Sequence, residues 1–305
     1  MCCFCFATDE GHPELMRGFR WAQTANYGTA PNPLMPNVFV SEAYDLADPW
    51  NTPKCAALGC CVAKTEKLGV NCTQDHRGEW DINGTLDSSG LGPLHPRTKK
   101  ELGARLAQGL YASTYDTAGT MIGQGPVFVG CAKAGSALTL KFNSSRLKGE
   151  KVTFSSTATA AAENTALYVL VKSNQTIDRS WISANHHTNI EYAGPYEAGN
   201  EMGYTGWRAV VANAGSAPNE LAIDLAQLGL TPAPTILAVR YAAGEGFNNT
   251  RMCCGPLVDT RLEPCPMQSC PLKATGLNTL PAVPFFAEVT AAGKCACFSP
   301  QVCDE

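Results

Sequence analysis

The chain has 305 residues, 45% of them hydrophobic and 16% charged, which is enough for one large domain or two ordinary ones with a real core. Its formal net charge of −4, without any stretch rich in Lys and Arg, argues against a nucleic-acid-binding surface. No run approaches the roughly 20 apolar residues of a transmembrane helix, so the sequence contains no membrane span of that kind.

Cysteines and glycosylation sequons indicate the secretory route. The chain has 15 cysteines, including the adjacent pairs Cys60-Cys61 and Cys253-Cys254. Disulfides persist only in oxidising compartments, and at least one cysteine of an odd total is free or paired with another chain. Sequons matter only in proteins that pass through that route. The predicted N-glycosylation sites are Asn71, Asn83, Asn143, Asn174 and Asn248. We therefore expect a secreted or lysosomal glycoprotein.

Metal binding is the alternative use of the cysteines and histidines. Cys295 and Cys297, like the adjacent cysteine pairs, are too close in sequence for the usual zinc ligands. The adjacent His186 and His187 point to opposite faces if they lie on a strand, which disfavours a shared metal with Glu191. We expect neither a metal nor another cofactor.

The first 45 residues are predicted to form a leader followed by turns and strands. Residues 1–14 are expected to be a disordered leader, without the basic start or the apolar length of a signal peptide. Prolines at 31, 33 and 36 exclude a helix through the next stretch. FRWAQTA is interpreted as a strand whose Arg20 and Gln23 are candidate substrate-binding residues, or else as an ordinary edge strand. VFVSEAYDL has the residues of a strand that ends in an acid.

A long insertion then leads into a helix. Residues 49–90 contain four cysteines, which predicts a disulfide-stapled loop. Pro96 and the capping box Thr98-x-x-Glu101 predict that the helix begins between 96 and 99. Leucines at 102, 106 and 110 predict one buried stripe, with Arg105 pointing elsewhere, and the helix is expected to end near Ser113.

From about residue 126 the pattern changes to short β-like runs. Examples are PVFVGCAKAGSALTLKF, ALYVLVKS, PTILAVRYAA and PFFAEVTA, and turn residues separate them at the spacing of a sandwich. The predicted fold class is α/β plus all-β. It comprises an α/β part over 15–118, a β-sandwich-like domain over 126–290 and a cysteine-containing tail over 291–305.

His95 is the candidate catalytic residue. Pro96 makes it the last residue before the helix, at a loop-to-helix junction where functional residues are common. A helix N-terminus disfavours imidazolium, which keeps the ring neutral and able to accept a proton as a general base. The alternative is a loop histidine without a role. Acids that could orient the ring, unranked by local evidence, are Asp45, Asp48, Asp81 and Asp87.

A nucleophile is harder to find. The chain has no G-x-S-x-G, and no G-D-S or G-Q-S near a strand end. Ser41 lies within a predicted strand, and Ser88 and Ser89 lie in the insertion. None of these three serines stands on a sharp turn with backbone amides ready for an oxyanion. A cysteine nucleophile is disfavoured where disulfides dominate.

Two blocks of sequence carry a family resemblance. FRWAQTANYGTAPNPLMPNVFVSEAYDLAD and GPLHPRTKKELGARLAQGLYA resemble the C-terminal part of the catalytic domain in the sialate O-acetylesterase family of SGNH-type carbohydrate acetylesterases. PTILAVRYAAGEG, EPCPMQSCPLK and LPAVPFFAEV resemble the family's C-terminal end. The resemblance implies a flavodoxin-like hydrolase domain with an accompanying β-rich region. It also implies cleavage of O-acetyl esters of sialic acid or related sugars by serine–histidine chemistry.

The same resemblance assigns the general base to His95, within His-Pro-Arg. Gly92 stands where many such enzymes have the orienting aspartate. The family's nucleophile and oxyanion donors lie upstream, in a G-Q-S-N-like block, so this chain is predicted to be a C-terminal portion that is inactive alone. The alternative is a non-catalytic, secreted carbohydrate-binding or structural module. Trp181 and Trp207 would favour sugar stacking if they are exposed, and the other interpretation places both in the core.

Overall fold

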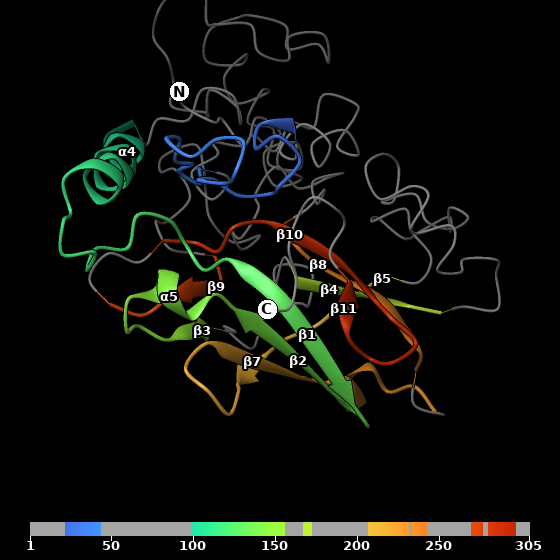
Figure 1. The fold of residues 1–305 in the computed structure, drawn as a ribbon. Coiled ribbons are helices and arrows are strands. Elements are labelled where there is room, and N and C mark those ends of the chain that lie inside the picture. The colour runs from blue at the N-terminus through green and yellow to red at the C-terminus, as the bar shows by residue number, and fades with distance from the viewer. Residues whose placement is uncertain are drawn as a thin grey trace, which may run out of the picture.

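The structure is a computed structural model and describes residues 22–43, 99–155, 167–172, 207–231, 234–242, 270–276 and 280–296. Two antiparallel sheets face each other, and helix α4 (Lys99–Thr114) lies at one end of them (Figure 1). The four-stranded sheet has the order β1 (Phe128–Ala134), β2 (Ala137–Phe142), β7 (Glu220–Asp224) and β6 (Asn213–Ala214). The five-stranded sheet has the order β11 (Cys295–Ala296), β10 (Phe285–Val289), β8 (Ile236–Tyr241), β4 (Leu167–Val171) and β5 (Trp207–Ala209).

Smaller elements complete the described part of the chain. Strands β3 (Val152–Phe154) and β9 (Leu272–Ala274) pair as a two-stranded sheet. The one-turn helix α5 (Ser144–Leu147) follows β2, and the 3₁₀ helix η5 (Leu225–Leu228) follows β7. The β-like runs expected from residue 126 onward therefore supply the strands of both sheets.

The core lies between the two sheets. In β2, the side chains of Leu138, Leu140 and Phe142 are fully buried, while the intervening residues are exposed or half-buried. This period of two is that of a strand with one face on a core and one in water. Residues of β7, β4, β8 and β10 complete the same core cluster. Strands β8 and β10 are buried along their whole length, so both faces of the five-stranded sheet are covered there.

Phe285 of β10 lies at the centre of this core. Its ring stacks on Phe128 with centroids 4.2 Å apart and meets Phe142 edge-on at 6.1 Å. Tyr241 of β8 also stacks on it, with centroids 6.0 Å apart. The four rings come from β1, β2, β8 and β10, so this aromatic cluster joins the two sheets.

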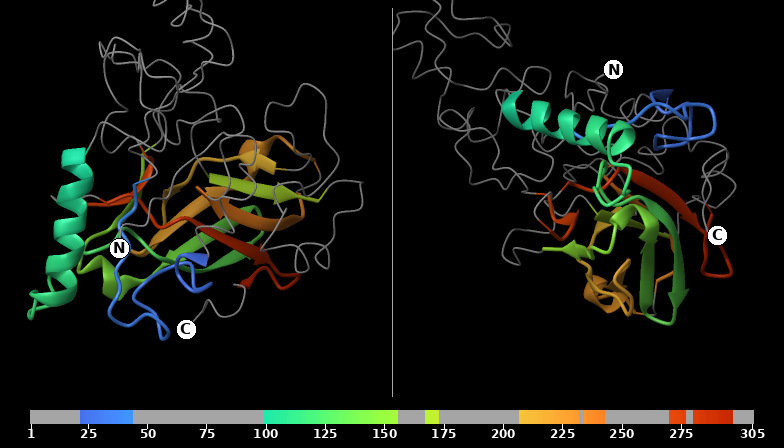
Figure 2. Two further views of the ribbon diagram at one scale, coloured as in Figure 1. Left: turned by 90° about the horizontal axis from the view of Figure 1, so that it is seen from above. Right: turned by 60° about the vertical axis from the view of Figure 1, so that its left-hand side comes forward.

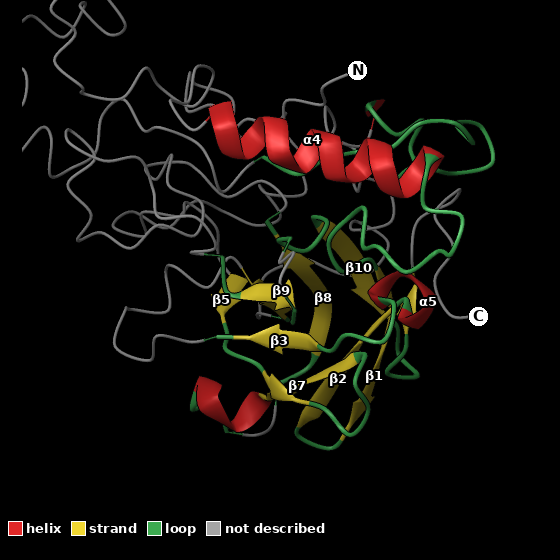
Figure 3. Ribbon diagram, turned by 90° about the vertical axis from the view of Figure 1, so that its left-hand side faces the viewer, coloured by secondary structure: helices red, strands yellow, loops and turns green. Residues whose placement is uncertain are grey.

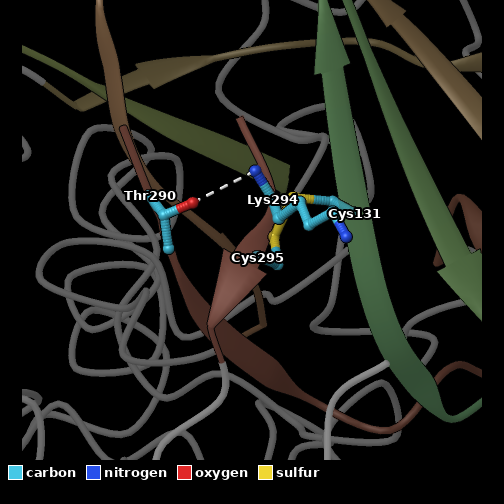
Figure 4. The surroundings of a disulfide bond; sticks show 4 residues. All are labelled: Cys131, Thr290, Lys294 and Cys295. Atoms are coloured by element: carbon cyan, nitrogen blue, oxygen red, sulfur yellow. Dashed lines mark hydrogen bonds between the residues drawn. A yellow bond between two sulfur atoms is a disulfide. The ribbon is translucent and has the colours of Figure 1, made fainter. Parts of the chain in front are cut away.

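A disulfide links one edge of the sandwich. Cys131 of β1 is bonded to Cys295 of β11, across 164 residues of sequence. Beside it, Lys133 donates its backbone N–H to Gly293, and the Lys294 amide donates to the Thr290 hydroxyl at 3.2 Å (Figure 4). Cys295 was predicted to lie in a tail after residue 290, whereas its strand β11 pairs with β10 as part of the sheet.

The predicted helix is present as α4, but its buried face differs from the prediction. Leu102 is buried and Leu106 is half-buried, whereas Leu110 is 48% exposed. Arg105, which was predicted to point elsewhere, is buried together with Gly109. A step of four residues drifts about 40° around a helix of 3.6 residues per turn, so positions 102, 105 and 109 share the inward face better than 102, 106 and 110.

The predicted strands before residue 46 are not strands where the structure describes them. Gln23 lies in a turn, because the amides of Ala25 and Tyr27 donate back to Ala22 and Thr24. Residues 38–43 have no regular secondary structure and are largely buried, and they pair with no strand in the described part of the chain. Their β-favouring composition reflects burial, since a run of such residues becomes a strand only beside a ladder partner.

Candidate functional site

Most of the predicted site residues lie outside the described residues. These are His95, Asp45, Asp48, Asp81, Asp87 and Arg20, together with Asn71, Asn83, Asn174, Asn248 and Trp181. Gln23 is half-buried in its turn, and Trp207 lies in β5. Asn143 caps the N-terminus of α5, where its side-chain oxygen accepts a hydrogen bond from the Arg146 amide at 3.2 Å.

The structure brings together the two segments that flank the predicted catalytic residues. The described part of VFVSEAYDL ends at Ala43, two residues before Asp45, and α4 begins four residues after His95. Arg105 of α4 donates from Nη1 to the backbone oxygen of Glu42 at 2.7 Å. Ala43 packs against Leu102 in a small apolar cluster. The chain just before Asp45 is therefore joined to the helix that follows His95.

Gly109 allows α4 to approach this segment closely. A Cβ at position 109 would lie 2.5 Å from the ring of Phe39, and one at Gly123 would lie 2.7 Å from the Ala112 side chain. Both glycines therefore sit where the connector 119–125 and the segment 22–43 meet the helix. In the right-hand view of Figure 2, this segment (blue) and α4 both lie above the sheets.

Gly109→Ala should weaken this contact. Because the added methyl group overlaps the Phe39 ring, we expect the free energy of unfolding to fall by about 1–3 kcal/mol, as is typical of overpacking. Denaturant unfolding measures the change. Gly103→Ala is the matched control on the same helix, since nothing lies within 4 Å of its added Cβ. That variant should gain up to about 1 kcal/mol from helix propensity. Equal changes in the free energy of unfolding for the two variants would contradict a close contact between Gly109 and Phe39.

A polar cluster, buried at Glu42 and Gln124 and half-buried at Thr29 and Arg146, connects the same segment to the connector and to α5. Gln124 accepts hydrogen bonds at its Oε1 from the Thr29 hydroxyl at 2.9 Å and from Arg146 Nη1 at 3.1 Å. Arg146 Nη2 donates to the backbone oxygen of Pro31 at 3.1 Å. Glu42, 1% exposed, completes the cluster. We name Thr29, Glu42, Gln124 and Arg146 the joint cluster.

Burial dominates the electrostatics of the joint cluster. It raises the pKa of Glu42 to about 7, against weaker opposing effects from the Glu42 and Gly125 backbones, the Gln124 side chain and the Arg105 charge. Gln124 lies near enough to favour the ionised form but does not complete a hydrogen bond to either carboxylate oxygen. Burial also lowers the pKa of Arg146, an effect that the Glu42 charge partly offsets.

None of the four residues of the joint cluster was predicted from the sequence. A signal was present, because Glu42 is a lone acid within the run VFVSEA, whose residues 40–43 are all buried. A charged residue in such a run is either a site residue or a structural group whose charge is suppressed. Glu42 is enclosed by protein, so we assign it a structural role.

Clusters of metal-ligating side chains and long apolar helices are two further kinds of feature that the described ranges could hold. No group of three His, Cys, Asp or Glu residues that could hold a metal ion occurs there. None of the helices in those ranges is both long and apolar enough to traverse a bilayer.

Comparison with known proteins gives a short sequence similarity. No family model matches the chain. A stretch of 42 residues, 14% of this chain, is 50% identical to sialate O-acetylesterase from Rattus norvegicus and 48% identical to that from Homo sapiens. The match spans 7% of the length of each relative. A solved carbohydrate acetylesterase from Xanthomonas citri aligns with 66% of this chain and 31% of its own, at a TM-score of 0.36 and 15% identity. Over its 42-residue stretch, the chain is thus similar to sialate O-acetylesterases.

Proposed function

We propose that this chain is the C-terminal portion of an SGNH-type carbohydrate acetylesterase that removes O-acetyl groups from sialic acid or a related sugar. The observation that carries the proposal is the 42-residue stretch that is about half identical to sialate O-acetylesterases. The His-Pro-Arg motif before α4 supports the proposal from the sequence. So does the contact between α4 and the segment that precedes Asp45.

In this proposal, His95 is the general base. It takes the proton from a serine hydroxyl as the serine oxygen attacks the acetyl carbonyl carbon. The protonated histidine then gives that proton to the departing sugar oxygen, which leaves an acetyl-enzyme. Water, deprotonated by the same histidine, hydrolyses the acetyl-enzyme and releases acetate. In this proposal Arg20 and Gln23 contact the substrate.

Two parts of this machinery, the orienting acid and the serine nucleophile, are not found at the family's positions within these 305 residues. Gly92 stands where an orienting aspartate is common, so Asp45, Asp48 or Asp87 takes that role in the proposal. No serine of these 305 residues lies in a nucleophile block of the family. A base without a nucleophile and oxyanion donors cannot form the tetrahedral intermediate, so the chain alone is expected to be inactive.

His95→Ala tests the assignment of the base. The first step is to sequence the transcript upstream of the Met1 codon and to express any longer product with an in-frame G-Q-S-N-like block. In that product we expect His95→Ala to lower kcat for O-acetylated sialic acid by about 10²–10⁴-fold, the usual loss for a general base. Release of acetate measures the rate.

His76→Ala is the matched control, since His76 lies in the 49–90 insertion and has no assigned role. It should retain the parent activity. Two results would contradict the proposal: turnover by the 305-residue chain itself that depends on His95, or a longer product in which His95→Ala is fully active.

We further propose that the protein is secreted or lysosomal and carries N-linked glycans. Asn143 is the proposed site whose surroundings are described. Its Oδ1 accepts from Ser145 Oγ at 2.7 Å and from the Arg146 amide, while a glycan attaches to Nδ2. The helix cap at α5 is therefore compatible with the modification.

Asn143→Asp separates the glycan from the cap. Aspartate caps a helix as well as asparagine does but accepts no N-glycan. In protein secreted from eukaryotic cells, we expect the variant to lose one glycan unit by mass while its melting temperature stays close to that of the deglycosylated parent. Ser145→Thr keeps the sequon and should retain the glycan. Identical masses for the Asn143→Asp variant and the parent would refute modification at this site.

A non-catalytic carbohydrate-binding module is the second candidate. The sandwich has its own aromatic core and a disulfide that joins its two sheets, features of a unit that folds independently of a catalytic site. Binding of acetylated glycans by the purified chain, without release of acetate by any longer product, would favour this function over the esterase.

A further inference from the structure

The carboxyl group of Glu42 has no role in the proposed reaction. Its side chain is almost completely buried, and neither carboxylate oxygen has a hydrogen-bond partner in the described part of the chain. An ionised carboxylate in such a place loses its hydration without any compensating hydrogen bond, whereas the neutral acid loses much less. The surroundings therefore favour the protonated side chain.

Two positive charges face Glu42, one from each helix packed near it. Arg105 of α4 uses Nη1 for the backbone oxygen of Glu42. Arg146 of α5 donates to Gln124 Oε1 and to the Pro31 oxygen. Both charges attract an ionised Glu42, but the effect of burial outweighs that of Arg105, and the resulting pKa is about 7. The Nε2 of Gln124 likewise has no hydrogen-bond partner within the described ranges.

The same groups attach the segment 22–43 to the rest of the molecule. Thr29 and Pro31 of the segment bond to Gln124 and Arg146, and the Glu42 backbone bonds to Arg105. Figure 3 shows α4 and α5 as separate helices, α4 beyond one end of the sheets and α5 next to them. The Glu42 side chain is buried where the segment contacts these helices. A change that makes its burial less favourable therefore also weakens the attachment of the segment.

We propose that Glu42 is a proton-operated clasp, which holds the segment 22–43 against α4 and the β-sandwich when its carboxyl is protonated and loosens when it ionises. The proposal is independent of esterase activity. The element that attaches and detaches is the segment 22–43 of this same chain, and proton binding controls its attachment.

The direction of the pH effect follows from linkage. The attached segment keeps its proton up to about pH 7, whereas a detached segment releases it near the ordinary value of 4.5. Between these values the attached state binds more protons, so attachment is strongest at low pH and is lost progressively as the pH rises from about 4.5 to 7. The two values correspond to a rise in the detached population of roughly 70-fold between pH 5 and pH 8.

Hydrogen exchange of the whole chain tests the clasp. The amides of Tyr27, Asn32 and Met35 donate to carbonyl oxygens within the segment and report its attachment. After correction for intrinsic exchange rates, we expect their protection factors to fall by roughly 70-fold from pH 5 to pH 8, while amides of β2 change little. The variant Glu42→Gln, which remains neutral, should show a flat profile and greater protection than the parent at pH 8.

Glu101→Gln is the matched control, because it makes the same chemical change on α4 outside the joint cluster. It should keep the pH dependence of the parent. A flat profile in the unmodified protein overturns the proposal, whether or not Glu42→Gln folds. So does a Glu42→Gln profile that falls as steeply as that of the parent.

Discussion

Replacing Cys131 and Cys295 together by alanine is expected to lower the free energy of unfolding by about 2–5 kcal/mol. The bond closes a loop across 164 residues of sequence, and cross-links over long loops remove much conformational freedom from the unfolded chain. In the native state it joins β1 to β11, and hence one sheet to the other. Denaturant unfolding measures the loss.

The denaturant slope provides an internal check on this prediction. Without the cross-link the unfolded chain is more expanded and exposes more surface, so the slope m should rise while the midpoint falls. Alkylation of the native protein before reduction, followed by mass mapping, shows whether the two thiols are joined. Alkylation of both cysteines under these conditions, or an unchanged free energy of unfolding in the double variant, would contradict the predicted role.

Replacing Phe285 by alanine is expected to destabilise the sandwich by about 3–5 kcal/mol. The ring contacts three aromatic side chains, from β1, β2 and β8, and is almost fully buried. Its removal leaves a cavity between the sheets that neighbouring strands cannot fill without breaking their pairing. Thermal and denaturant unfolding give the difference from the parent protein.

Two controls define this effect. Phe285→Leu retains most of the apolar volume and should cost only about 1–2 kcal/mol. Leu230→Ala removes an apolar side chain that is 42% exposed and should change stability by about 0.5 kcal/mol or less. A loss below about 1 kcal/mol in Phe285→Ala would mean that the aromatic cluster does not hold the sheets together.

The local pattern predicted elements well where a single periodicity dominates. The β-like runs after residue 126 and the helix after Pro96 were predicted from patterns within a few residues, which the sequence displays directly. The inward face of α4 was predicted less well, because Arg105 is buried by a hydrogen bond to the distant Glu42 backbone. A long side chain that ends in a charged group is predicted to be exposed unless a buried hydrogen-bond partner is known.

The segment 38–46 shows the limit of composition as evidence. Its apolar and aromatic residues wrongly indicated a strand over 38–43, because pairing depends on a neighbour that the local sequence does not specify. Residues 40–43 are buried without being part of a sheet. The site residues adjacent to this segment remain predictions from motif resemblance.

The sequence by itself determined the β-rich character of the chain after residue 126, the helix that follows His95, and the motif that links the chain to acetylesterases. These depend on short-range periodicity, on caps and on motifs that are contiguous in sequence. Only the tertiary structure decided that Cys131 pairs with Cys295, that four aromatic rings meet at Phe285, and that Glu42 is buried beside Arg105 and Gln124. Each of these joins residues far apart in the chain, and their proximity follows from how the elements pack rather than from any local preference.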